Sequence, residues 1–196
     1  MKLKDLLQKN TTAIAERWLD RTLETYVSRT AVFFKQKKDP FANPVGEALR
    51  SGTKAIVDEL LEAESPLGPE SAHRLCAHLE DVIKMRSVQD LNPSQAVSFV
   101  FSLKQAIREV LEEELRDPGF ASELTTIETQ IDQLMLFAFD IYVKSREQLY
   151  ELRVNEIKRT GFRLLKKADL IVLDEDPEPK EDWAMNNLCR PRGGGS

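Results

Sequence analysis

The segment LMLFAFDIYV, at residues 134–143, is an apolar run that only Asp140 interrupts. It is too short to span a bilayer, because a transmembrane helix needs about 20 apolar residues. It lies within a stretch from about Ser122 to Ala168 that has no proline and one glycine, which predicts one long helix. Since a helix that is apolar on nearly all sides is usually buried, we expect residues 134–143 to form the central helix of an all-α bundle.

Four further helices are predicted before this segment, which gives a bundle of about five. Their predicted positions are residues 3–34, a helix starting at 43–44, residues 70–87, and a helix from 92 that stops at 117–119. Asn43-Pro44 is a helix start signal, and Asn92 with Gln95 has the spacing of a capping box. Gly52 falls on the apolar side of its helix, where we expect it to permit close helix contact.

After Val143 the apolar residues become sparser and fall at spacings of four and three. Tyr150, Val154, Ile157 and Leu164 form this line, with Gly161 and Ala168 at its weaker positions, and charged residues surround it. Such a heptad pattern packs a helix against a partner helix. We therefore expect a homodimer or another protein partner on this face; the alternative is that the face packs back on the chain's own bundle.

The composition changes beyond the long helix, which divides the chain into a bundle at 1–168 and a tail at 169–196. Residues 174–182 are acidic and contain proline, so they cannot bury a core, and we expect the tail to be disordered. Trp183, Met185 and Leu188 form a short apolar group within it. They belong either to a disordered end or to a peptide that docks on a partner.

The overall composition argues against several classes of protein. The chain of 196 residues has a net charge of −5, which argues against a general nucleic-acid binder, since that would need a basic surface. We find no signal peptide and no apolar run long enough to cross a membrane. Cys76 and Cys189 form no disulfide framework, so we expect a cytoplasmic protein.

No catalytic pattern is evident, and we expect neither an enzyme nor a cofactor. His73, Cys76 and His78 are weak candidates for metal ligands, but a closed site would need further ligands, and surface histidines with one buried cysteine are the simpler interpretation. Asp140 is the one charged residue predicted in the core. It either pairs with an arginine such as Arg17 or Arg108, lies exposed at a gap in the packing, or acts as a polar sensor inside a pocket.

Three short segments and the long last helix carry a family resemblance. Leu3-Lys-Asp-Leu-Leu, Ile14-Ala-Glu-Arg-Trp18 and the helix start Pro44-Val-Gly46 resemble the RsbRD N-terminal domain family, over about residues 3–165. The resemblance implies a globin-like fold without haem, of the kind found in the sensor domains of bacterial stressosome co-antagonists. It also implies dimerisation through the last helix and a signal passed to a following domain.

In the family that following domain is a phosphorylatable STAS domain, whereas here only the acidic tail follows the helix. We therefore expect a stand-alone form, acting as a non-catalytic sensory or protein-interaction module. One alternative is an accessory or regulatory subunit of a respiratory redox complex, associated peripherally with a membrane complex and docking through its tail. A further alternative is a haem- or metal-binding protein, with His73 or His78 as the axial ligand.

Overall fold

The computed structural model describes residues 2–26, 43–63, 67–89 and 91–168, and these ranges contain helices and no strand. The predicted all-α fold is confirmed. The α-helices are α1 (Leu3–Lys9), α2 (Thr11–Glu24), α4 (Pro44–Glu62), α5 (Pro69–Ser87), α6 (Pro93–Val97), α7 (Phe99–Val110) and α8 (Ala121–Lys167), and the short 3-10 helices are η1 (Glu114–Arg116) and η2 (Pro118–Phe120).

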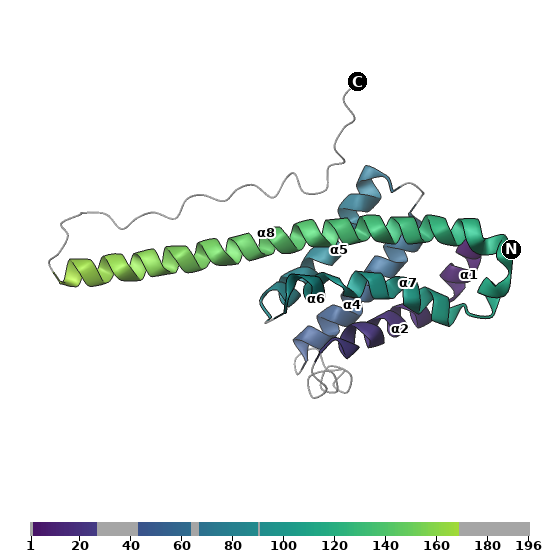
Figure 1. The fold of residues 1–196 in the computed structure, drawn as a ribbon, viewed down its shortest axis with the longest axis horizontal. Helices are drawn as coiled ribbons and strands as arrows, with labels where there is room; N and C mark the ends of the chain where they lie inside the picture. The colour runs from purple at the N-terminus through teal and green to yellow at the C-terminus, as the bar shows by residue number, and fades with distance from the viewer. Residues whose placement is uncertain (1, 27–42, 64–66, 90, 169–196) are drawn as a thin grey trace, which may run out of the picture.

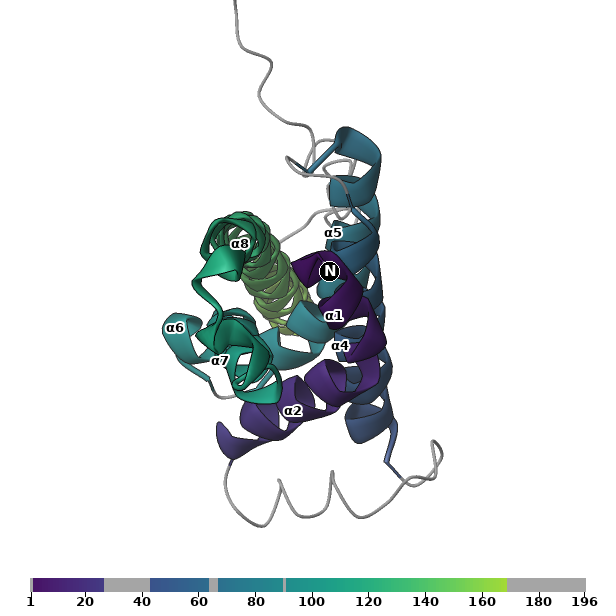
Figure 2. The same cartoon turned by 90° about the vertical axis from the view of Figure 1, so that its right-hand side faces the viewer.

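Five of these helices form a closed ring around one hydrophobic core. Going round the ring, α8 contacts α5, α5 contacts α4, α4 contacts α2, α2 contacts α7, and α7 returns to α8. The short α1 lies at one end, against α2, α4 and α8 (Figure 2). Figure 1 shows that α8 passes along one side of the bundle and then continues well beyond it. The long helix is therefore one member of the ring, not a rod at its centre.

The predicted helix start signals have the expected geometry. Asn43 caps α4, because its side chain accepts a hydrogen bond from the backbone N–H of Gly46 at 2.9 Å. Asn92 and Gln95 form the predicted capping box of α6. Gly52 lies where α4 crosses α5: a Cβ added there would come within 2.5 Å of Val82 Cγ2. The expectation of a close helix contact at this glycine is therefore confirmed.

Two of the predicted helices are each broken in two. The first breaks at Asn10, which separates α1 from α2, and the described part of α2 ends at Glu24. The fourth breaks at Ser98, which separates α6 from α7. At this second break Trp18 of α2 donates its indole N–H to the carbonyl oxygen of Phe99 at 2.6 Å, and the two rings stack. The second break depends on this distant partner, which local propensity does not predict. At the first break the partners are local, because Asn10 donates backbone and side-chain N–H groups to the carbonyls of Leu6 and Leu7.

A buried arginine, Arg86 at the end of α5, joins three parts of the bundle. Its guanidinium donates to the backbone carbonyls of Gln95 and Ala96 and to the hydroxyl of Tyr26, each at 2.8 Å. It also lies over the rings of Tyr26 and Phe99, at 5.0 and 5.2 Å from their centroids. Burial lowers the pKa of Arg86 from its ordinary value. The hydrogen bonds and aromatic faces offset the cost of burying this charge.

A surface ion-pair cluster links α2 to α7. Arg17 and Arg21 of α2 both donate to the carboxylate of Glu109 on α7. Hydrogen bonds from Arg21 and then Arg17 lower the pKa of Glu109 to about 2. Arg17 therefore pairs with Glu109, and not with Asp140 as one interpretation of the sequence had it.

The expectation that residues 134–143 are buried on all sides was wrong. One face of α8, with Ile131, Leu134, Ala138, Ile141 and Tyr142, packs on the core. The opposite face is exposed: Leu136 is 66% accessible, Phe139 is 48% accessible, and Asp140 is exposed as well. The reason is the position of α8 in the ring, which buries only the side between α5 and α7. Asp140 is thus a surface residue and not a polar core residue.

Candidate functional site

Exposed apolar side chains line the outer face of α8, on both sides of the point where it leaves the bundle. We call this set the outer stripe; its members are Leu136, Phe139, Val143, Tyr150, Val154, Ile157 and Leu164, all of them exposed. They are separated by three, four or seven residues, so they fall on one face of a helix. Ile157 is 71% accessible and Leu164 is 63% accessible, which shows that the predicted seam does not pack on the chain's own bundle.

The outer stripe continues the predicted seam backward into the bundle. Sequence reasoning identified Tyr150 to Leu164 but assigned Leu136, Phe139 and Val143 to the core. The missed signal was a double periodicity: residues 131–143 carry two apolar lines on opposite faces of the helix. A helix that is apolar all round has either one enclosing core or two separate partners, and here only one of the two faces has a partner within the described residues.

Arg146 marks the place where α8 leaves the bundle. Its guanidinium donates to the backbone carbonyl of Ser87 at the end of α5, at 3.0 Å, and to the hydroxyl of Tyr150, also at 3.0 Å. It also lies 5.1 Å from the centroid of the Tyr150 ring. The first residue of the projecting stripe is therefore tied to the bundle through this arginine.

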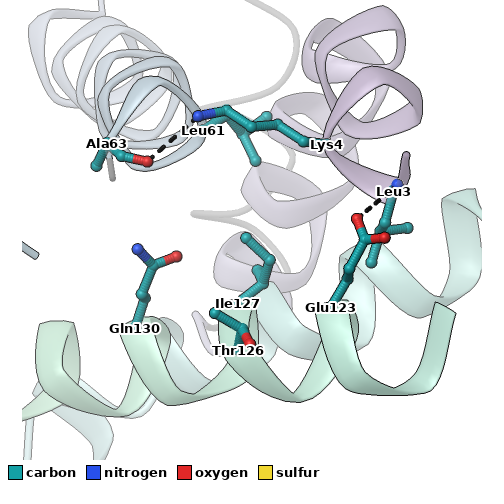
Figure 3. Close-up of a pocket in the computed structure, with 8 residues that line it drawn as sticks. All are labelled: Leu3, Lys4, Leu61, Ala63, Glu123, Thr126, Ile127 and Gln130. Carbon is teal, nitrogen blue, oxygen red and sulfur yellow. Dashed lines mark hydrogen bonds between the residues drawn. The ribbon is translucent and has the colours of Figure 1, made fainter. Parts of the chain in front are cut away.

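A cavity of about 280 Å³ lies at the other end of the bundle, between α1, the end of α4 and the first turns of α8 (Figure 3). Its apolar lining comes from Leu3, Leu61, Ala63 and Ile127. This volume lies just below the usual range for ligand pockets, which is about 300–1,000 Å³. Sequence reasoning did not find the cavity, because the three segments that line it are far apart in the chain.

The polar groups of this cavity come from α1 and α8. Glu123 accepts a hydrogen bond from the backbone N–H of Leu3 at 2.8 Å. Lys4 reaches across to the carbonyl oxygens of Glu62 and Ala63, each 3.4 Å from its Nζ, which is long for a hydrogen bond. Gln130 lines the cavity from the next turn of α8 and is itself buried. The arrangement suits a small, mainly apolar molecule with one polar group.

The weak metal candidates lie on α5 and do not converge. His73 is exposed, Cys76 is buried and His78 is half-buried. Within the described ranges, no group of three or more His, Cys, Asp or Glu residues is placed to hold a metal ion. The tail candidates Trp183, Met185 and Leu188 lie outside the described residues. None of the described helices is both long and apolar enough to cross a membrane.

Comparison with known proteins assigns the family. The model of the RsbT co-antagonist protein rsbRD N-terminal domain matches residues 12–157, which run from the second residue of α2 to Ile157 in α8. No curated protein and no solved structure matches the chain. The match covers most of the 196 residues. With its ring of helices and long terminal helix, the chain belongs to the family of RsbT co-antagonist rsbRD N-terminal domains.

Proposed function

We propose that this chain is a non-catalytic sensory module of the cytoplasm, whose output is the pairing of α8 with α8 of a second copy. The observation that carries the proposal is the outer stripe on a helix that extends beyond its own bundle. Exposing seven large apolar side chains to water on one face of a helix is energetically unfavourable. Packing against a partner helix removes this apolar surface from water. Family membership adds support, since the matched domain is named for a regulatory co-antagonist.

The position of α8 supports a connection between ligand binding in the end cavity and the proposed pairing of the outer stripe. Its first turns line the end cavity, its middle packs against α5 and α7, and its last turns project. A molecule that enters the cavity contacts α8 directly, through Thr126, Ile127 and Gln130. A shift of the helix there changes its position against α5 and α7, and thereby the stripe that it presents. The proposed mechanism is thus a change of packing that travels along one rigid element.

Light scattering coupled to size-exclusion chromatography tests the output. The wild-type chain should be a dimer and the Ile157→Glu variant a monomer, because a carboxylate in the stripe would be buried without a partner. Leu152→Glu is the matched control, since Leu152 is 66% accessible but lies on the other side of α8; this variant should remain a dimer. A wild-type chain that is monomeric at all concentrations would contradict the proposal.

A cavity-filling substitution tests the input. Thr126→Trp should fill part of the end cavity and change the dimer dissociation constant severalfold, while circular dichroism shows the same helix content. Ser122→Trp, on an exposed position of the same helix outside the cavity lining, is the control and should leave the constant unchanged. Equal dissociation constants for the wild type and both variants would show that the cavity is not coupled to the output.

A further inference from the structure

The projecting part of α8 (Figure 1) carries a second line of exposed side chains besides the outer stripe. We call this line the basic face; its members, at spacings of seven, four and three residues, are Leu152, Arg159, Arg163 and Lys166. Arg159 follows Ile157 of the outer stripe by two residues, and Lys166 follows Leu164 by two. Two residues correspond to about 200° around a helix, so the basic face and the outer stripe lie on opposite sides of α8.

This part of the helix is strongly basic, although the chain as a whole has a net charge of −5. Residues 152–167 carry six basic residues and one acidic residue, Glu156, which lies at the edge of the basic face. Arg159, Arg163 and Lys166 are exposed and form no ion pair within the described ranges. Like charges held close together on one helix face repel one another, and an acidic partner removes this repulsion. The basic face therefore fits an acidic partner.

The complementary charge occurs in the same chain, shortly after the helix. Residues 174–182 carry six acidic residues and one lysine, so their net charge is equal and opposite to that of residues 152–167. Because this acidic segment is tethered to α8, its effective concentration at the helix is on the order of millimolar. It also repels nucleic acid and anionic membranes, which would otherwise compete for the same cations. The charges therefore favour the chain's own acidic segment as the occupant of the basic face.

The lengths of the two segments are compatible with this contact. The basic face from Leu152 to Lys166 is about 21 Å long, at about 1.5 Å per helical residue. The seven residues from Lys167 to Asp174 reach at most about 23 Å, which is enough to reverse direction beside a helix about 10 Å wide. The nine residues from Asp174 to Trp183 reach about 28 Å when extended. An acidic segment that runs back along the basic face therefore brings Trp183 to Leu152, the exposed apolar residue at its far end.

We propose that residues 174–182 of this chain bind along the basic face of α8 and that Trp183 packs on Leu152. The carboxylates of the acidic segment pair with Arg159, Arg163 and Lys166, and the indole covers an apolar side chain that is 66% accessible without it. The bound segment keeps other anions away from the basic face. This contact does not depend on the proposed function, because it uses the side of α8 opposite to the outer stripe.

Acrylamide quenching of tryptophan fluorescence in the full chain tests the charge contact. Trp18 is fully buried, so the quenching reports mainly on Trp183. The double variant Arg159→Glu with Arg163→Glu should raise the quenching constant about twofold or more, because repulsion replaces attraction and releases the acidic segment. The matched control, Arg153→Glu with Lys158→Glu, makes the same change of charge away from the basic face and should stay near the wild type. Equal constants in all three proteins, or an equal rise in both variants, overturn the proposal.

Charge exchange gives a rescue experiment. Asp174→Lys and Asp176→Lys, added to the variant with Arg159→Glu and Arg163→Glu, restore opposite charges on the two segments and should return the quenching constant toward the wild-type value. Circular dichroism should show the same helix content in each protein. A quadruple variant as strongly quenched as the double variant would mean that the acidic segment does not pair with the basic face.

A pair of leucine substitutions tests where Trp183 lies. Leu152→Ala should raise the quenching constant, with little change in the free energy of unfolding, because the contact is local and separate from the core. Leu164→Ala, on the outer stripe, is the control and should leave the quenching constant unchanged. Greater exposure of Trp183 in Leu164→Ala, with no effect of Leu152→Ala, would place the tail on the outer stripe and overturn the proposal. The dimer measured by light scattering is a separate readout, so the two proposals can fail independently.

Discussion

The two halves of α8 differ in what surrounds them, although both are helical and both carry apolar residues. Up to Ser145 the helix buries one face against α5 and α7, and Glu128 and Asp132 form ion pairs with Arg108 and Lys104 of α7. From Arg146 onward no residue of α8 is fully buried, and its large side chains are exposed. The first half therefore contributes to the stability of the fold, whereas the second half has apolar side chains that stay exposed in the described part of the chain.

The same apolar spacing therefore occurs on a buried face and on an exposed face of α8, and the neighbouring helices determine which of the two a residue belongs to. In the first half an apolar line faces the core, and a second one on the opposite face continues the projecting stripe. Substitutions in the two halves should therefore separate into effects on unfolding and effects on association.

The largest effect on stability is expected for Arg86→Ala in the bundle. The substitution leaves a cavity and removes the donors for the carbonyls of Gln95 and Ala96, so we expect a loss of about 3–5 kcal/mol in the free energy of unfolding. Arg153→Ala, in the exposed projecting half, is the control and should change this quantity by less than about 0.5 kcal/mol. Urea denaturation followed by circular dichroism measures both, and similar values would contradict the difference in stability between the bundle and the projecting half of α8.

A smaller difference is expected between two leucines of α8 itself. Leu134 is fully buried, and Leu134→Ala should lower the free energy of unfolding by about 2–4 kcal/mol through lost burial and a residual cavity. Leu152 is exposed and lies off the outer stripe, so Leu152→Ala should have an effect within about 0.5 kcal/mol. Thermal unfolding at a fixed protein concentration compares them; a large loss for Leu152→Ala would show that the projecting half has an internal partner.

The smallest effect concerns the ion-pair cluster between α2 and α7. Because Arg21 and Arg17 lower the pKa of Glu109 to about 2, its contribution is present above the unfolded pKa near 4.5 and is lost as the pH falls toward 2. Glu109→Gln should therefore cost up to about 1 kcal/mol at pH 7, and the difference from the wild type should shrink through this acidic range. Urea denaturation at several pH values measures the difference. The control, Glu156→Gln in the projecting half, should show none; a difference independent of pH would exclude the ion pair as its cause.

The sequence was sufficient for much of the fold, because helix caps and periodicity are local signals. The starts at Asn43 and Asn92, the close contact at Gly52 and the single long last helix were all predicted and are present. The break at Ser98 was not predicted, since it depends on contacts made by residues distant in the chain, such as Trp18 and Arg86. The break at Asn10 was missed as well, although its hydrogen bonds to Leu6 and Leu7 are local.

Only the part of the candidate site that has a local sequence signal was predicted. The projecting stripe has a single periodicity and was recognised, whereas its continuation at Leu136, Phe139 and Val143 was assigned to the core. Hydrophobicity alone does not distinguish a core face from a face that awaits a partner. The end cavity was missed because no local pattern records that Leu3, Leu61 and Ile127 meet. The metal candidates His73, Cys76 and His78, and the tail at 169–196, stay predictions.

Because α8 is long and unbroken, a small rotation at the edge of the bundle produces a much larger displacement at its far end. The helix runs through 47 residues without a kink-forming proline, and its projecting part of roughly 22 residues is about 33 Å long. A tilt of about 5° where Arg146 meets Ser87 moves the far tip by about 3 Å, over half the helical pitch. The exposed side chains near the end of α8 are therefore the part of the helix most displaced by a small tilt at the edge of the bundle.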